Sequence, residues 1–135
     1  MATILAQITI RAGKEAEFEA IARELYSASH EGEPGLRRYE YWRGQDPRTY
    51  YTLLAFDDHR SFIAHQVSDH HEGVSPALGQ VIEDIRLEYV DPIHGASDLP
   101  PTEHQTAPDD ADDLTSEYTD RFAATVATWW HSMRS

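Results

Sequence analysis

Apolar and polar side chains alternate along the first segment of the chain, which is the pattern of a half-buried β-strand. Within residues 3–10, one face carries four apolar side chains, those of Ile4, Ala6, Ile8 and Ile10. Apolar residues then recur at helical spacing, at Phe18, Ile21, Ala22, Leu25 and Tyr26. The stretch Gly32-Glu33-Pro34-Gly35 predicts the end of that helix, because it combines glycine and proline.

A β-hairpin is predicted next, with arms Leu36–Arg43 and Thr49–Phe56 joined by a turn at residues 44–48. Asp57 or Asp58 is a suitable N-cap for a second helix that runs to about Val67, and Pro76 is predicted to open a further helical stretch. Residues 85–90 form the last predicted strand. The order βαββαβ predicts a ferredoxin-like α+β domain over residues 1–92, with a four-stranded antiparallel sheet covered by helices on one face.

The predicted hairpin carries apolar residues on both faces, with Tyr39 and Tyr41 on one face and Leu36 and Trp42 on the other. A sheet that is half apolar on both faces needs a cover for the face without helices, and a second copy of the same sheet is the usual cover. We therefore expect a homodimer, in the form of a dimeric α+β barrel.

Beyond Pro92 the composition changes. Residues 93–113 are rich in Pro, Asp, Ser and Thr and predict a flexible acidic linker. Residues 114–135 predict an amphipathic C-terminal helix, N-capped by Thr115 or Ser116 and carrying Trp129 and Trp130 as packing anchors. A short helix cannot bury two tryptophans alone, so it is expected to dock on its own domain, on the partner subunit or on another protein.

The 135-residue chain has 24 acidic and 11 basic residues, a formal net charge of −13, which disfavours nucleic acid and anionic membranes as partners. The absence of cysteine excludes disulfides, thiolate catalysis and cysteine zinc sites. The N-terminus has no signal-peptide pattern, and no apolar run has the length of a bilayer span. These features predict a cytoplasmic protein.

Three imidazoles, those of His65, His70 and His71, lie near the end of the predicted second helix. Their spacing does not indicate a metal site, because no pair four residues apart presents two nitrogens to one ion, although folding could add His59, Asp57, Asp58 or Asp69. An acid/base role is favoured, because imidazole titrates near neutrality. The structural alternative is that His65 binds a backbone carbonyl while His70 and His71 lie in solvent.

Three stretches resemble the antibiotic biosynthesis monooxygenase family of dimeric α+β barrels. Residues 4–10 with Gly13-Lys14-Glu15 are similar to its first strand and turn, and residues 33–40 are similar to its entry into the second strand. The segment from Phe62 to His71 resembles its histidine signature and gives His65 and His70 the two histidine positions. The chain differs at two positions on the third strand, where Leu54 replaces a frequent Glu and Phe56 replaces a Trp.

The resemblance implies oxidation of a hydroxylated aromatic or quinol by O2 without metal or cofactor, with His65 and His70 as the catalytic residues. The residues expected to bind substrate are Arg38, Tyr39, Tyr41, Tyr51 and Phe56. Two alternatives stay open. One is a non-catalytic dimeric barrel that binds a small ligand or a partner, which the missing carboxylate at Leu54 favours. The other is a haem-binding or haem-degrading member.

Overall fold

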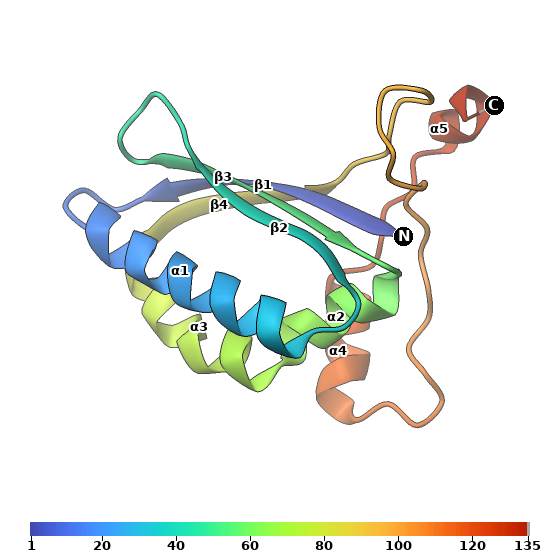
Figure 1. The fold of residues 1–135 in the computed structure, drawn as a ribbon. Helices are drawn as coiled ribbons and strands as arrows, with labels where there is room; N and C mark the ends of the chain where they lie inside the picture. The colour runs from blue at the N-terminus through green and yellow to red at the C-terminus, as the bar shows by residue number, and fades with distance from the viewer. Residues whose placement is uncertain (135) are drawn as a thin grey trace.

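A computed structural model describes residues 1–134 of the chain. The elements, in order, are β1 (Ala2–Ile10), α1 (Glu15–Gly32), β2 (Leu36–Arg43), β3 (Thr49–Phe56), α2 (His59–Val67), α3 (Asp69–Val81), β4 (Ile82–Tyr89), α4 (Asp113–Arg121) and α5 (Thr128–Met133). The sheet is antiparallel with strand order β2-β3-β1-β4, and α1 and α3 cover one of its faces (Figure 1). This confirms the predicted ferredoxin-like α+β fold.

The alternation along β1 places its side chains as predicted. Ile4, Ala6, Ile8 and Ile10 are buried under the helices, while Leu5, on the opposite face, is 38% exposed. β1 pairs with β3 on one side and with β4 on the other, so it lies at the centre of the sheet. Burial of this apolar face against α1 is the main source of stability in such a two-layer fold.

The second helical region consists of two helices with a sharp break between them. Asp58 caps α2 by accepting a hydrogen bond from the Ser61 N–H at 2.8 Å. At Ser68 the backbone is extended, and the Ser68 hydroxyl accepts from the His71 N–H, which starts α3. The prediction that Pro76 opens a helix is wrong, because the cap at Ser68 starts α3 at Asp69 and the helix runs through Pro76.

Residues 93–112 contain no helix or strand, yet they are tied to the sheet. Thr102 is fully buried, where its hydroxyl donates to the Val90 carbonyl at 2.7 Å and accepts from the Thr3 N–H at 3.2 Å. The Glu103 N–H donates to the Met1 carbonyl at 3.0 Å. Near the C-terminus, Arg134 binds Asp91 at 2.8 Å and also Glu103. These contacts hold the segment against the start of β1 and the end of β4.

The tail forms two short helices in place of the single helix predicted over residues 114–135. Asp112, not Thr115 or Ser116, caps α4, and helical structure stops after Arg121. The carbonyl of Phe122 accepts hydrogen bonds from Tyr89 Oη and His59 Nε2, so it is engaged with the domain instead of a further helical turn. Trp129 in α5 is 66% exposed, so this chain does not bury it. Ser135, the last residue of the predicted helix, lies outside the described residues.

α4 docks on α2 and on the start of α3 in its own chain. Tyr118 Oη donates to Glu72 at 2.7 Å, and the rings of Phe122 and Phe62 meet edge to face at 6.2 Å. His59, which is 1% exposed, joins two parts of the tail to α2. Its Nδ1 accepts from the Gln105 N–H at 3.1 Å, and its Nε2 donates to the Phe122 carbonyl at 3.0 Å.

Replacing His59 with alanine is expected to release the tail while the sheet stays folded. The change leaves the Gln105 N–H without its partner and the Phe122 carbonyl with Tyr89 alone, at a cost of about 1–3 kcal/mol. Hydrogen–deuterium exchange measured by mass spectrometry should show faster exchange over residues 104–124 and unchanged exchange in β1. His94→Ala, at an exposed position of the tail, is the control. Equal protection in the two variants would contradict this role of His59.

Within residues 1–134, no helix combines the length and the apolar character that a membrane crossing requires.

Candidate functional site

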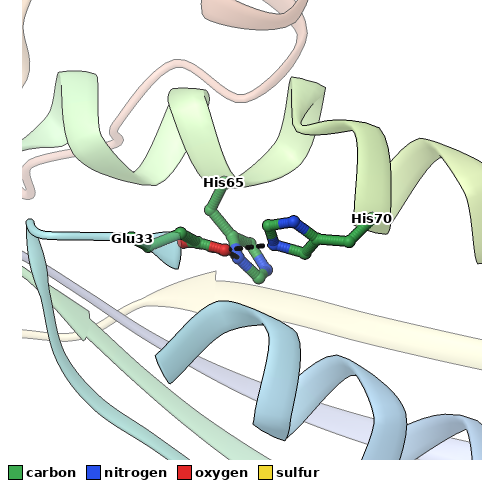
Figure 2. A group of neighbouring side chains, drawn as sticks. All are labelled: Glu33, His65 and His70. Atoms are coloured by element: carbon green, nitrogen blue, oxygen red, sulfur yellow. Dashed lines mark hydrogen bonds and ion pairs between the residues drawn. The ribbon is translucent and has the colours of Figure 1, made fainter. Parts of the chain in front are cut away.

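Three polar side chains from different segments converge on one another, as Figure 2 shows. Glu33 follows α1, His65 lies in α2 and His70 lies in the first turn of α3. Glu33 Oε2 is 2.9 Å from His65 Nδ1 and 2.5 Å from His70 Nε2. Ser29 Oγ, fully buried, is 3.5 Å from the same His65 nitrogen and 3.4 Å from that of His70. One carboxylate therefore links two imidazoles.

Local backbone structure directs Glu33 toward α2. Glu33 is the C-cap residue of α1, with an extended backbone, and its N–H donates to the Ser29 carbonyl at 3.0 Å. The turn that follows packs directly on α2, because a Cβ atom at Gly35 would lie 2.4 Å from Ser61 Oγ. Glycine is needed at this position for the chain to approach so closely. The loop after α1 is thereby held beside the helix that carries His65.

The break at Ser68 brings His70 to the same carboxylate. The prediction from histidine spacing considered only pairs four residues apart on one helix, and no such pair is present among His65, His70 and His71. His65 and His70 instead belong to two helices, because α2 ends at Val67, as predicted, and α3 starts at Asp69. The imidazole nitrogens of His65 and His70 consequently lie close to one another, with all three ligand atoms of the cluster within 4.8 Å.

The environment keeps Glu33 ionised. Burial alone would raise its pKa, but hydrogen bonds and charge from His65, with further hydrogen bonds from His70 and Ser29, outweigh burial and leave the pKa below its usual value. An anionic carboxylate that accepts from Nδ1–H holds an imidazole in the form whose Nε2 carries the lone pair. His65 is thus arranged as a hydrogen-bonded base in an apolar setting, being itself 1% exposed.

Aromatic rings surround His65 and connect it to the sheet. The ring of Tyr39 meets the imidazole edge to face at 5.3 Å, and the ring of Phe56 lies at the same distance. Tyr39 Oη and Tyr41 Oη share a hydrogen bond of 2.5 Å. Burial raises the pKa of Tyr41 to about 12, and burial, Tyr41 and the charge of Glu33 raise that of Tyr39 well above its ordinary value. Both hydroxyls therefore stay protonated near neutral pH.

A pocket of about 710 Å³ opens between α1 and the β2–β3 hairpin. Its lining residues are Phe18, Glu19, Ala22, Arg23, Tyr26, Ser27, Glu40, Tyr41, Trp42, Arg43 and Tyr50. Hydrogen bonds from Arg43 and Tyr50 lower the pKa of Glu19 to about 2, so this carboxylate is a weak base. Tyr41 lines the pocket and also bonds Tyr39, so it joins the pocket to the surroundings of His65.

The structure brings together some of the residues predicted for the site and separates others. Tyr39, Tyr41 and Phe56 lie with the histidines on the helix-covered face of the sheet. Arg38 and Tyr51 lie on the opposite face, because side chains alternate along a strand. Arg38 borders a separate depression with residues 95–98.

Sequence reasoning missed Glu33, Ser29, Glu19 and Tyr50. The sequence places Glu33 in a helix-ending turn and in the stretch that resembles the family's entry into the second strand, but it assigns Glu33 no role. The carboxylate was expected at position 54 on the third strand, where this chain has Leu54. That position is a buried apolar residue in the structure. A useful signal was available in the sequence, since a charged residue between a helix end and Pro-Gly is placed at a defined turn, where its direction is restricted.

His71 is a third imidazole beside the cluster, with its ring 5.0 Å from that of His65. Its Nδ1 is buried without a hydrogen-bond partner among the described residues. Burial, and then the nearby charges of His65 and His70, lower the pKa of His71 to about 4. The unfolded chain, in which histidine titrates near 6.5, therefore binds more protons than the folded chain between these two values.

The free energy of unfolding is accordingly expected to fall as the pH drops from 6.5 to 4, by about 2–3 kcal/mol from His71 alone. His71→Phe should remove this part of the acid sensitivity, because phenylalanine fills similar space without titrating. Urea unfolding at pH 7, 5.5 and 4.5 measures the effect, with His94→Phe as an exposed control. Equal loss of stability in wild type and His71→Phe would contradict the expectation.

Comparison with known families gives one match. A sequence model of the antibiotic biosynthesis monooxygenase family matches residues 1–75, a span that includes Glu33, His65 and His70. No curated protein matches the sequence.

Solved structures share the fold at low identity. A candidate antibiotic biosynthesis monooxygenase from Caulobacter crescentus CB15 has a TM-score of 0.65 and 22% identity, covering 68% of this chain and 89% of that one. A second candidate monooxygenase, from Nitrosomonas europaea, has a TM-score of 0.64 and 16% identity, with 69% and 99% covered. The protein PA3566 from Pseudomonas aeruginosa has a TM-score of 0.61 and 21% identity, with 66% and 90% covered. About a third of this chain lies outside each comparison.

Proposed function

The chain belongs to the antibiotic biosynthesis monooxygenase family, and from this we propose that it is a cofactor-independent monooxygenase acting on a hydroxylated aromatic or a quinol. One observation carries the proposal. An aromatic-lined pocket of about 710 Å³ has a size suited to a small aromatic molecule. Its Tyr41 shares a hydrogen bond with Tyr39, whose ring packs against a buried imidazole that a carboxylate orients.

The proposed reaction begins with removal of a phenolic proton from the bound substrate. The resulting anion is electron-rich and passes one electron to O2, and the two radicals combine to form a peroxide at a ring carbon bearing hydrogen. Loss of water then yields a quinone. One oxygen atom of O2 enters the quinone and the other leaves as water, so the substrate is its own reductant.

The protein contributes a base, orientation and exclusion of water. His65 is the proposed proton acceptor, with Glu33 holding its Nδ1–H and stabilising the imidazolium that forms. Tyr41 and Tyr39 are proposed to pass the proton between pocket and imidazole, as neutral hydroxyls that both donate and accept. His70 shares the Glu33 carboxylate and is 27% exposed, so it is placed to exchange the proton with solvent.

We also propose that the molecule acts as a homodimer joined through the sheet face that lacks helices. Leu5, Trp42 and Tyr51 project from this face with exposures of 38%, 59% and 39%. Exposed aromatic and apolar side chains grouped on one face are typical of an interface. Light scattering coupled to size-exclusion chromatography should give twice the chain mass, and Leu5→Glu should shift it toward one chain.

The activity is tested with a panel of one-ring and fused-ring phenols and hydroquinones under air, with EDTA present to suppress oxidation by trace metals. An oxygen electrode should record substrate-dependent O2 consumption. Mass spectrometry of the product formed under ¹⁸O2 should show one labelled oxygen atom per quinone. Saturable binding without turnover of any compound would favour the non-catalytic binding protein.

Filling the pocket is expected to lower turnover without unfolding the protein. Ala22 lines the pocket and is 6% exposed, so Ala22→Leu adds bulk where the substrate is proposed to bind. We expect a loss of about 10-fold or more in kcat/KM, which corresponds to about 1.4 kcal/mol or more of lost transition-state binding. Ala20→Leu, on the exposed side of the same helix, is the matched control. Equal turnover by the two variants would place the substrate elsewhere.

A further inference from the structure

The Glu33, His65 and His70 cluster presents three good metal-ligand atoms to one point. Glu33 Oε2 lies 2.9 Å from His65 Nδ1 and 2.5 Å from His70 Nε2, and all three ligand atoms fall within 4.8 Å of one another. Figure 2 shows the three side chains pointing inward from separate segments. In residues 1–134, no other set of three His, Asp or Glu side chains brings its ligand atoms this close.

We propose that this cluster binds a divalent transition-metal ion of the Zn²⁺ class, with one Glu33 carboxylate oxygen, His65 Nδ1 and His70 Nε2 as the protein ligands. The proposal goes beyond the proposed oxygenation and describes a separate state of the same residues, because an ion on His65 Nδ1 takes the place of the proton that Glu33 holds in the proposed base. Two imidazoles and one carboxylate form the three-ligand set of many zinc enzymes and of the iron(II) facial triad. The nitrogen donors disfavour Mg²⁺ and Ca²⁺, which take oxygen ligands.

Two of the three donor–donor distances are close to those that this ion requires. Zinc lies about 2.0–2.1 Å from nitrogen and oxygen ligands, and tetrahedral binding separates neighbouring donors by roughly 3.3 Å. The present nitrogen–oxygen distances of 2.5 and 2.9 Å are shorter, so the donors must separate by less than about 1 Å. His70 is the least buried member, at 27% exposed, and can make most of that adjustment.

The surroundings of the cluster suit a bound cation. Glu33 supplies one negative charge, and its side chain is 11% exposed, which strengthens its attraction for an ion. Ser29 Oγ lies 3.4 and 3.5 Å from the two ligand nitrogens and adds a further oxygen to the cluster. The partial exposure of His70 provides a route for the ion from solvent.

Metal binding is tested on the full chain after treatment with EDTA and its removal. Calorimetry with Zn²⁺ should show one ion bound per chain, and Co²⁺ should give the visible absorption of a four- or five-coordinate nitrogen–oxygen site. Thermal unfolding should shift to higher temperature with Zn²⁺, because the ion binds the folded chain. None of these measurements requires catalytic activity.

Substitutions of the proposed ligands test whether the ion binds at this cluster. Glu33→Gln and His70→Ala should each weaken Zn²⁺ binding at least about 10-fold and abolish the Co²⁺ spectrum. Glu33→Gln preserves shape and His70 is partly exposed, so both variants are expected to fold, which circular dichroism checks. His94→Ala, which removes an exposed imidazole of the tail, should bind like wild type.

Three results would overturn the proposal. They are the absence of saturable one-to-one binding, binding that survives both Glu33→Gln and His70→Ala, and binding that His94→Ala abolishes. Each is distinct from a failure of the oxygenase activity, which is assayed in the presence of EDTA.

Discussion

His65→Ala is expected to lower the rate of O2-dependent turnover by about 100-fold or more, with circular dichroism close to that of wild type. The size of the effect follows from the role of His65 as the proposed general base, since positioned proton transfer contributes about 10²–10⁴ in rate. Its Nδ1 is bound to Glu33, and its ring is held between Tyr39 and Phe56, so its position is defined by its neighbours. Oxygen consumption with the best substrate of the panel measures the rate.

Because His65 is buried, its loss also removes packing, so further variants separate chemistry from folding. His65→Asn keeps a polar side chain of smaller volume and should be equally slow. Glu33→Gln keeps the shape of the neighbour and should lower kcat by changing the orientation and charge of the imidazole. His94→Ala should leave the rate unchanged. A rate for folded His65→Ala within twofold of wild type would remove His65 from the mechanism.

Phe62→Ala is expected to lower the free energy of unfolding by about 3–5 kcal/mol, the cost of deleting a fully buried aromatic ring. Phe62 is 1% exposed and contacts three other rings, those of Phe56 at 5.5 Å, Tyr89 at 5.9 Å and Phe122 at 6.2 Å. It thus joins α2 to the sheet and to the tail. Urea unfolding followed by tyrosine and tryptophan fluorescence measures the change.

Ile93→Ala provides the comparison, since Ile93 is 76% exposed and its truncation should cost less than about 0.5 kcal/mol. Similar costs for Phe62→Ala and Ile93→Ala would mean that the tail and α2 contribute little to the cooperative unit. A loss of about 3–5 kcal/mol in the free energy of unfolding for Phe62→Ala, together with faster hydrogen exchange in residues 104–124, would support the joint role of Phe62.

The fold could be predicted because its elements depend on local patterns. Alternation at Ile4, Ala6, Ile8 and Ile10 identified the central strand, and Asp58 was among the expected helix caps. The start of α3 was predicted at Pro76, because proline is common in the first turn of a helix. The helix starts earlier, because Ser68 supplies the hydrogen bond that caps it. Similarly, the break after α4 depends on Phe122, whose carbonyl partners lie far away in sequence.

The candidate site could be predicted only in part. Strand alternation places Tyr39, Tyr41 and Phe56 on one face of the sheet. One helix, α2, brings His65 to the same face. Glu33 is 32 residues from His65. The turn that holds it leaves a local signal, but its approach to His65 also depends on the close contact of Gly35 with α2 and on the packing of α1 beside α3, which no local pattern encodes. In the pocket, Glu19 of α1 likewise binds Arg43 of β2 and Tyr50 of β3, so these contacts join separate elements.

The attachment of the tail to the sheet has a consequence for biosynthesis. The ribosome releases residues 1–92 first, so the sheet and its helices can assemble while Phe62 and Tyr89 still lack the cover that Phe122 provides. At that stage the nascent chain exposes an aromatic patch of the kind that chaperones bind and that promotes aggregation. The tail, which is translated after the sheet, covers this patch when Phe122 packs on Phe62.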